Sequence, residues 1–96
     1  MQVFVCALDV EIHLPHAQSL KAKRSVVKHV VESARQRFGV AAAEVGHQEL
    51  WQRSRLGFAA VGSGPDHVSE VLDSLERFVW SQPDLEVVSM ERRWLE

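Results

Sequence analysis

Two spacings of hydrophobic residues alternate along the chain, and together they predict six elements of secondary structure. From Gln2 to His13 the residues form an extended run in which one parity is apolar and the other is mixed, which is typical of a strand with one buried face. The apolar residues of that parity are Phe4, Cys6, Leu8, Val10 and Ile12. Similar extended runs predict further strands over Val40 to His47, Leu56 to Gly62 and Leu85 to Trp94.

Two other segments carry apolar residues at spacings of three, four and seven, which predict amphipathic helices. The first helix follows Ser19, a good N-cap residue, and ends at Gly39, a good C-terminal cap. The second begins at Pro65 or Asp66 and ends before Ser81. In the first helix the helical period turns the following side chains outward: Lys21, Arg24, Lys28, Glu32 and Arg35.

The order βαββαβ predicts one domain over residues 1–96, an α+β two-layer sandwich of the ferredoxin-like type. A four-stranded antiparallel sheet in the order 4-1-3-2 would carry both helices on one face. The larger apolar set should turn toward the helices. The opposite, open face would then carry Val3, Val5, Ala7, Arg55, Gly57, Ala59 and Val61. Such a smooth apolar face commonly packs against a second copy or another partner, although small apolar residues also occur on monomers.

Composition places the chain among ordinary globular proteins. Its 96 residues are 46% hydrophobic and 25% charged. No apolar run is long enough to cross a bilayer, and Met1 leads directly into a strand pattern rather than a leader, so we expect a cytoplasmic protein without a membrane partner. The single cysteine, Cys6, lies within an apolar strand and is expected to be buried rather than reactive.

The net charge is only −2, but the charges are distributed unevenly. Residues 16–65 hold eight basic and three acidic side chains, a balance of +5, whereas residues 66–96 hold three basic and eight acidic ones, a balance of −5. A basic middle segment can bind phosphate while an acidic end repels a polyanion. The alternative is that two solvated helix faces simply differ in sign.

Residues 44–57 mix polar, charged and aromatic side chains in a way that is poorly suited to a core. In the predicted topology this turn lies beside the start of the first helix, where free backbone N–H groups favour anions. Arginine and lysine would contact phosphates, and Trp51 could stack on an unpaired base. The predicted RNA- or anion-binding residues are Lys21, Lys23, Arg24, His47, Gln48, Trp51, Arg53 and Arg55. Alternatively, Trp51 covers the core and Glu44 pairs with Arg53 or Arg55 across the hairpin.

Several blocks of sequence occur in a fixed order along nearly the whole chain. They are Ser19–Lys28, Phe38–Val40, Glu44–His47, Leu50–Arg53 and Leu56–Gly57. In these blocks the chain resembles the YlxP-like family of small bacterial proteins, a domain of unknown function (DUF503). The resemblance implies a ferredoxin-like fold. Genes of that family often lie beside genes for translation initiation and ribosome maturation, which implies ribosomal RNA or the ribosome as a partner.

No motif predicts catalysis, so we expect a non-enzymatic protein without a cofactor. His13, His16 and His47 could approach one another, but their spacing is weak evidence for zinc, and no metal site is predicted. Two functions remain open. The first is an RNA- or ribosome-associated accessory factor that binds through the basic edge. The second is a protein-interaction or self-assembly module, for example a homodimer, whose interface would contain Val5, Ala7, Ala59 and Val61.

Overall fold

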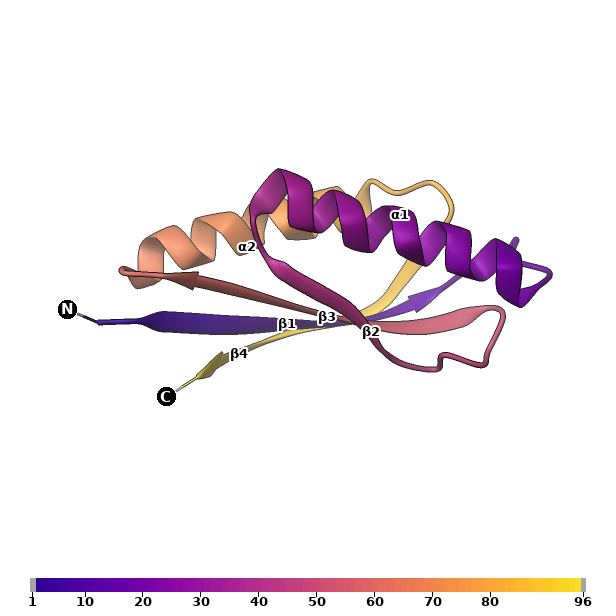
Figure 1. Ribbon diagram of the computed structural model, residues 1–96, viewed down its shortest axis with the longest axis horizontal. Helices are drawn as coiled ribbons and strands as arrows, with labels where there is room; N and C mark the ends of the chain where they lie inside the picture. Colours follow the sequence, from indigo (N-terminus) through magenta and orange to yellow (C-terminus); the bar gives the residue numbers. More distant parts are fainter. Residues whose placement is uncertain (1, 96) are drawn as a thin grey trace.

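A computed structural model of the chain describes residues 2–95 and contains the predicted βαββαβ order (Figure 1). Four strands and two helices follow one another without a long linker. Their bounds are β1 Phe4–His13, α1 Leu20–Phe38, β2 Ala41–Gly46, β3 Arg53–Gly62, α2 Pro65–Trp80 and β4 Glu86–Leu95. Both helices cover the same face of the sheet, and the other face is left open (Figure 1). The predicted two-layer ferredoxin-like architecture is therefore confirmed.

The sheet has the order β2-β3-β1-β4, which is the predicted order 4-1-3-2 read from the other edge. All three neighbouring pairs are antiparallel. Strand β3 begins at Arg53, three residues earlier than the pattern predicts. The reason is the long partner strand β1, because His13, Ile12 and Glu11 pair in turn with Arg53, Ser54 and Arg55.

Helix α1 is closed at both ends by the predicted residues. The Ser19 side chain accepts a hydrogen bond from the Ala22 amide at 3.0 Å, which satisfies one of the free N–H groups of the first turn. Gly39 adopts a left-handed conformation with φ of 66°, and its N–H donates to the Arg35 carbonyl. This conformation is costly for residues with a Cβ atom, which explains glycine here.

The predicted parity of the sheet is also confirmed. One face of β1 and β3 packs against the helices and forms the core, which includes Cys6, Leu8, Val10, Ile12, Leu56, Phe58 and Ala60. Cys6 is fully buried, and burial raises the pKa of its thiol, so it behaves as a small core residue. Within residues 2–95, neither helix has the length and hydrophobicity that a membrane crossing requires.

Candidate functional site

The turn between β2 and β3 is held against the start of α1. The Leu14 amide donates to the Gln52 carbonyl at 2.9 Å, and Gln52 Nε2 donates to the Ala17 carbonyl at 3.1 Å. From α1, Lys23 Nζ donates to the His47 carbonyl at 2.7 Å. The turn and the helix start therefore form one corner of the molecule, as the topology predicts.

Lys23 is fully buried, and its assignment as a phosphate-binding residue is wrong for this structure. Its ammonium group lies 2.6 Å from Glu44 Oε2 and donates to the backbone carbonyls of His47 and Gln48 at 2.7 and 3.2 Å. These three acceptors match the three N–H donors of a lysine. Lys23 thus stabilises the corner from inside and presents no charge to an external anion.

The helical period explains why Lys23 points inward. Residues three or four apart share one side of a helix, and Lys23 lies on the same side as Val27, Val30 and Ala34, all of which are buried. Lys21 and Arg24 lie on the other side of α1 and are exposed. The sequence signal was therefore available, because Lys23 falls outside the outward stripe defined by the same period.

Glu44 does not pair with Arg53 or Arg55, as one alternative held. It accepts a hydrogen bond from Ser54 Oγ at 2.6 Å and pairs with Lys23. Ser54 itself is fully buried. Glu44 is the register partner of the buried Leu56, two residues after the buried Ala42, so strand alternation turns it toward the helix layer, where Lys23 is available.

Arg53 and Arg55 are occupied by carboxylates of the neighbouring strand β1. Arg53 Nη2 lies 2.5 Å from Glu11 Oε2, and Arg55 forms a two-pronged pair with Asp9. The bond from Arg55 lowers the pKa of Asp9, and the bond from Arg53 lowers the pKa of Glu11. The charges of both arginines are thus largely neutralised within the chain, which weakens their predicted role on phosphates.

The remaining side chains of the turn are accessible. Trp51 is 54% exposed and does not cover the core, so that alternative is wrong. His47 and Gln48 are also exposed. His47 has a φ of 59°, an uncommon conformation for a residue with a side chain, and its Nε2 lies 3.0 Å from Glu11 Oε2.

Two of the three histidines of this end contact carboxylates on different strands. His47 contacts Glu11, whereas His13 Nδ1 lies 3.1 Å from Glu86 Oε1 on β4. In the part of the chain that the structure describes, no group of three or more histidine, cysteine, aspartate or glutamate side chains could hold a metal ion.

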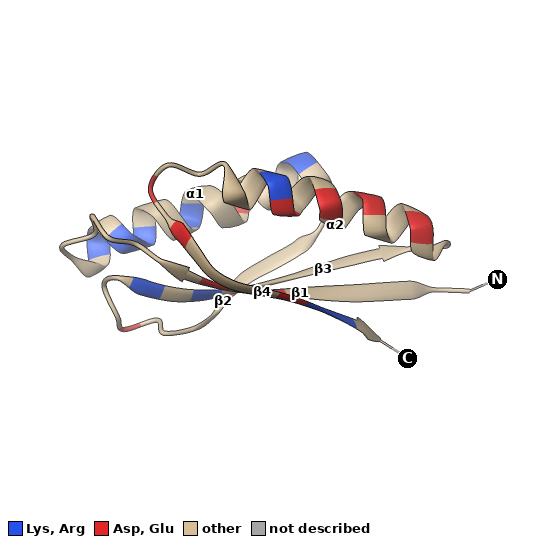
Figure 2. Cartoon of the chain, turned by 180° about the vertical axis from the view of Figure 1, so that it is seen from behind, with Lys and Arg blue, Asp and Glu red and all other residues tan. Residues whose placement is uncertain are grey.

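A row of exposed basic residues runs along the outer side of α1. Lys21, Arg24, Lys28 and Arg35, here termed the α1 stripe, form no ion pair with any residue in the range 2–95. Arg35 donates to the uncharged Ala42 carbonyl at 2.6 Å, so it keeps its net charge. By contrast, carboxylates contact Lys23, Arg53, Arg55, Arg92 and Arg93. Figure 2 shows the basic residues along α1 and the acidic ones along α2, so the helix layer is polarised from one helix to the other.

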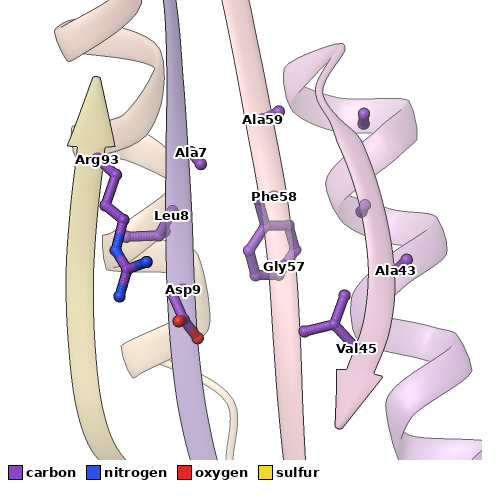
Figure 3. Close-up of a pocket in the computed structure, with 11 residues that line it drawn as sticks. Ala7, Leu8, Asp9, Ala43, Val45, Gly57, Phe58, Ala59 and Arg93 are labelled. Carbon is purple, nitrogen blue, oxygen red and sulfur yellow. The ribbon is translucent and has the colours of Figure 1, made fainter. Parts of the chain in front are cut away.

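The open face of the sheet contains a shallow apolar hollow of about 390 Å³. Small residues form its floor, chiefly Ala7, Ala43, Gly57 and Ala59 (Figure 3). Val45 reaches from β2 over Gly57, where an added Cβ atom would lie only 3.0 Å from Val45 Cγ1. Glycine at position 57 therefore leaves room for the Val45 side chain on the open face, which a larger residue would displace.

Comparisons with known proteins agree with this architecture. Residues 5–92 match the family described as "Protein of unknown function (DUF503)". The chain belongs to the DUF503 family. It is 35% identical over 86 residues to the uncharacterized protein YlxP of Bacillus subtilis, a match that covers 90% of this chain and 94% of YlxP. The resemblance found in the sequence blocks is thus confirmed.

A solved structure is similar to this chain in fold alone. The designed protein Foldit4 superposes with a TM-score of 0.60 at 10% identity, and the match covers 99% of this chain and 98% of the designed one. The four-stranded sheet with two helices is thus shared with a protein of unrelated sequence.

Proposed function

We propose that this DUF503 protein is a non-enzymatic cytoplasmic accessory factor that binds RNA through the α1 stripe and the adjoining turn. Ribosomal RNA is the first RNA to test, because genes of the family often lie beside genes for translation and ribosome maturation. Compared with the surface predicted from the sequence, the proposed one keeps Lys21, Arg24 and Trp51. It adds Lys28 and Arg35, and it leaves out the buried Lys23 and the carboxylate-paired Arg53 and Arg55.

The observation that carries the proposal is the contrast between paired and unpaired cations. Basic side chains on the sheet contact carboxylates, whereas those of the α1 stripe form no ion pair among residues 2–95. The stretch from Lys21 to Arg35 spans roughly 21 Å of helix, at about 1.5 Å per residue. Four cations over that length, with only Glu32 on the same side, give a linear arrangement that suits a polynucleotide backbone.

Trp51 lies on the turn that Lys23 and Gln52 hold against the inward side of α1 and the segment before it, at the end of the helix where the stripe begins. An exposed aromatic ring at the end of the molecule where the stripe begins can stack on an unpaired base, which contributes about 1–3 kcal/mol per base in single-strand binding. A single-stranded or bulged RNA is therefore the favoured form, with its backbone along α1 and one base on Trp51.

Titration of a labelled single-stranded ribosomal RNA fragment at several salt concentrations tests the proposal. Four phosphate contacts predict a slope of log affinity against log salt of about −2.8, so affinity should fall roughly 50-fold between 50 and 200 mM salt. The triple variant Lys21→Glu, Arg24→Glu and Lys28→Glu should abolish this salt-sensitive binding. Unchanged affinity in that variant would rule the surface out.

Matched single variants separate the site from overall charge. Lys28→Glu on α1 and Arg77→Glu on α2 change the net charge equally, and both residues are exposed. Only Lys28→Glu should weaken binding several-fold at 150 mM salt, where distant charges are screened. Trp51→Ala should weaken binding about tenfold or more without changing the salt slope, because stacking releases no counterions.

A further inference from the structure

The open face of the sheet leaves an apolar surface at one end of the strands. Val3, Val61 and Leu95 are 73%, 65% and 72% exposed, and they lie at the end where β1 begins and β3 and β4 finish. Val5 pairs with both Val61 and Leu95, so these side chains share one face. The surface is separate from the α1 stripe, which lies in the helix layer.

At the other end of the same face, charged residues of one sign lie along each of two neighbouring strands. Strand β1 contributes Asp9 and Glu11, and strand β3 contributes Arg53 and Arg55. One strand is thus acidic and its neighbour basic at the same end of the sheet. Between the two ends the hollow has Ala7 and Ala59 at its centre, with Val45 over Gly57 on one side and Arg93 next to Ala7 on the other, so a second layer would approach most closely at the alanines.

The geometry points to a second copy of this chain as the partner of the open face, related by a two-fold axis parallel to β1 and β3. Rotation about that axis keeps every residue at its level along the strands and exchanges β1 with β3. Apolar ends then meet, with Val5 over Val61 of the other copy. Glu11 of each copy lies over Arg55 of the other, because these residues share one level in the sheet.

The other in-plane two-fold axis, perpendicular to the strands, is disfavoured. It would place the valine-rich end of one copy against the arginine and carboxylate end of the other, and would bury charges against apolar groups.

The size of the face is compatible with a reversible dimer. Three strands of 10 residues and one of 6 form it. A rise of about 3.3 Å per residue and a strand spacing of about 4.8 Å then give a face of roughly 600 Å² per copy. That is near the roughly 800 Å² per partner of a standard stable interface, so a dimer that dissociates on dilution is expected.

Sedimentation of the full chain at 1–100 μM tests whether the dimer exists. A concentration-dependent dimer is expected. Ala7→Glu should shift it to monomer by at least tenfold in dissociation constant, because Ala7 lies near the axis and is exposed in the single chain. The matched variant Ala22→Glu, at an exposed position of α1, should leave the dimer intact. A monomeric wild-type chain at 100 μM, or equal dimerisation of both variants, would overturn the proposal and leave the face to a different protein.

Charge reversal tests the direction of the axis. Glu11→Arg alone and Arg55→Glu alone should each weaken self-association, since each places like charges over one another at two sites. An equimolar mixture of the two variants should restore a mixed dimer. There the arginine introduced in one copy lies over the glutamate introduced in the other, while the native Glu11 and Arg55 face each other at the second site. Folding of each variant is verified by circular dichroism before mixing. Failure of the mixture to associate, with both variants folded, would exclude this arrangement.

Discussion

At the scale of single residues, Lys23 shows how a charge can be accommodated in the core of a small domain. Its side chain crosses the apolar side of α1 and ends at a carboxylate and two carbonyl oxygens. Because a buried ion pair loses hydration, such a pair adds little net stability over apolar residues of similar volume. The clearest consequence of the Lys23 contacts is that they hold β2 and the following turn against α1.

Replacing Lys23 by Met should destabilise the chain by about 3 kcal/mol, at the lower end for a broken buried pair. Glu44 would lose its counter-ion while two carbonyl oxygens lose their donor. The partial exposure of Glu44 keeps the cost from being larger. Urea unfolding of Lys23→Met measures this, with Lys21→Met as the control, expected within about 0.5 kcal/mol of wild type. Adding Glu44→Gln should recover part of the loss, and no recovery would contradict the pair as its cause.

The sequence predicted correctly which side chains are buried where the alternation of a strand alone determines burial. Alternation alone placed Cys6 and Leu8 in the core, and both are fully buried. The sequence did not predict the ion pairs between residues that lie far apart along the chain. Nothing local to Arg53 or Glu44 indicates that the first would pair with Glu11, 42 residues away, and the second with Lys23. Those pairings depend on strand register and on the packing of α1 against the sheet, which tertiary structure determines.

At the scale of elements, the ion pairs between β1 and β3 couple the stability of the sheet to pH. Asp9 and Glu11 have folded-state pKa values below their ordinary values of 3.8 and 4.5. A lowered pKa means that the pair stabilises the fold above the unfolded-state pKa, and that this contribution is lost as pH falls through the folded-state value. The sensitive window therefore lies below about pH 5.

The double variant Asp9→Asn and Glu11→Gln should consequently show a shallower loss of unfolding free energy between pH 5 and pH 3 than the wild-type chain. At pH 7 the variant should be modestly less stable, because these pairs are partly exposed and solvent screens them. Urea unfolding at pH 3, 4, 5 and 7 measures both effects at one protein concentration. Parallel pH profiles would show that other carboxylates determine the acid limit.

At the scale of the whole molecule, the two helices have opposite charge. Helix α1 holds six basic and one acidic side chain, a balance of +5, and α2 holds four acidic and one basic, a balance of −3. The sequence predicted this polarity correctly, since charge follows from composition along the chain. It could not show which cations are free, because that depends on the pairing described above for the sheet.

The distance over which the charges of the two helices act depends on the salt concentration. Electrostatic fields reach about 30 Å at 10 mM salt but only about 8 Å at 150 mM. The minor dimensions of the molecule are 21 and 18 Å, so the charges of α2 act on a ligand at α1 only at low salt. Helix α2 should therefore slow the approach of RNA without contacting it.

Removing charge from α2 tests this expectation. Asp66 and Glu70 are exposed and form no ion pair within residues 2–95, so Asp66→Asn with Glu70→Gln removes two negative charges and leaves the α1 stripe unchanged. Stopped-flow association with a labelled single-stranded RNA should be about two- to fivefold faster than wild type at 10 mM salt and equal to it at 150 mM. Glu32→Gln, on the same side of α1 as the stripe, should accelerate binding at both concentrations, because the charge of Glu32 lies within the screening length of an RNA bound there. An equal effect of the two changes at 150 mM salt would show that the RNA contacts α2 as well as α1.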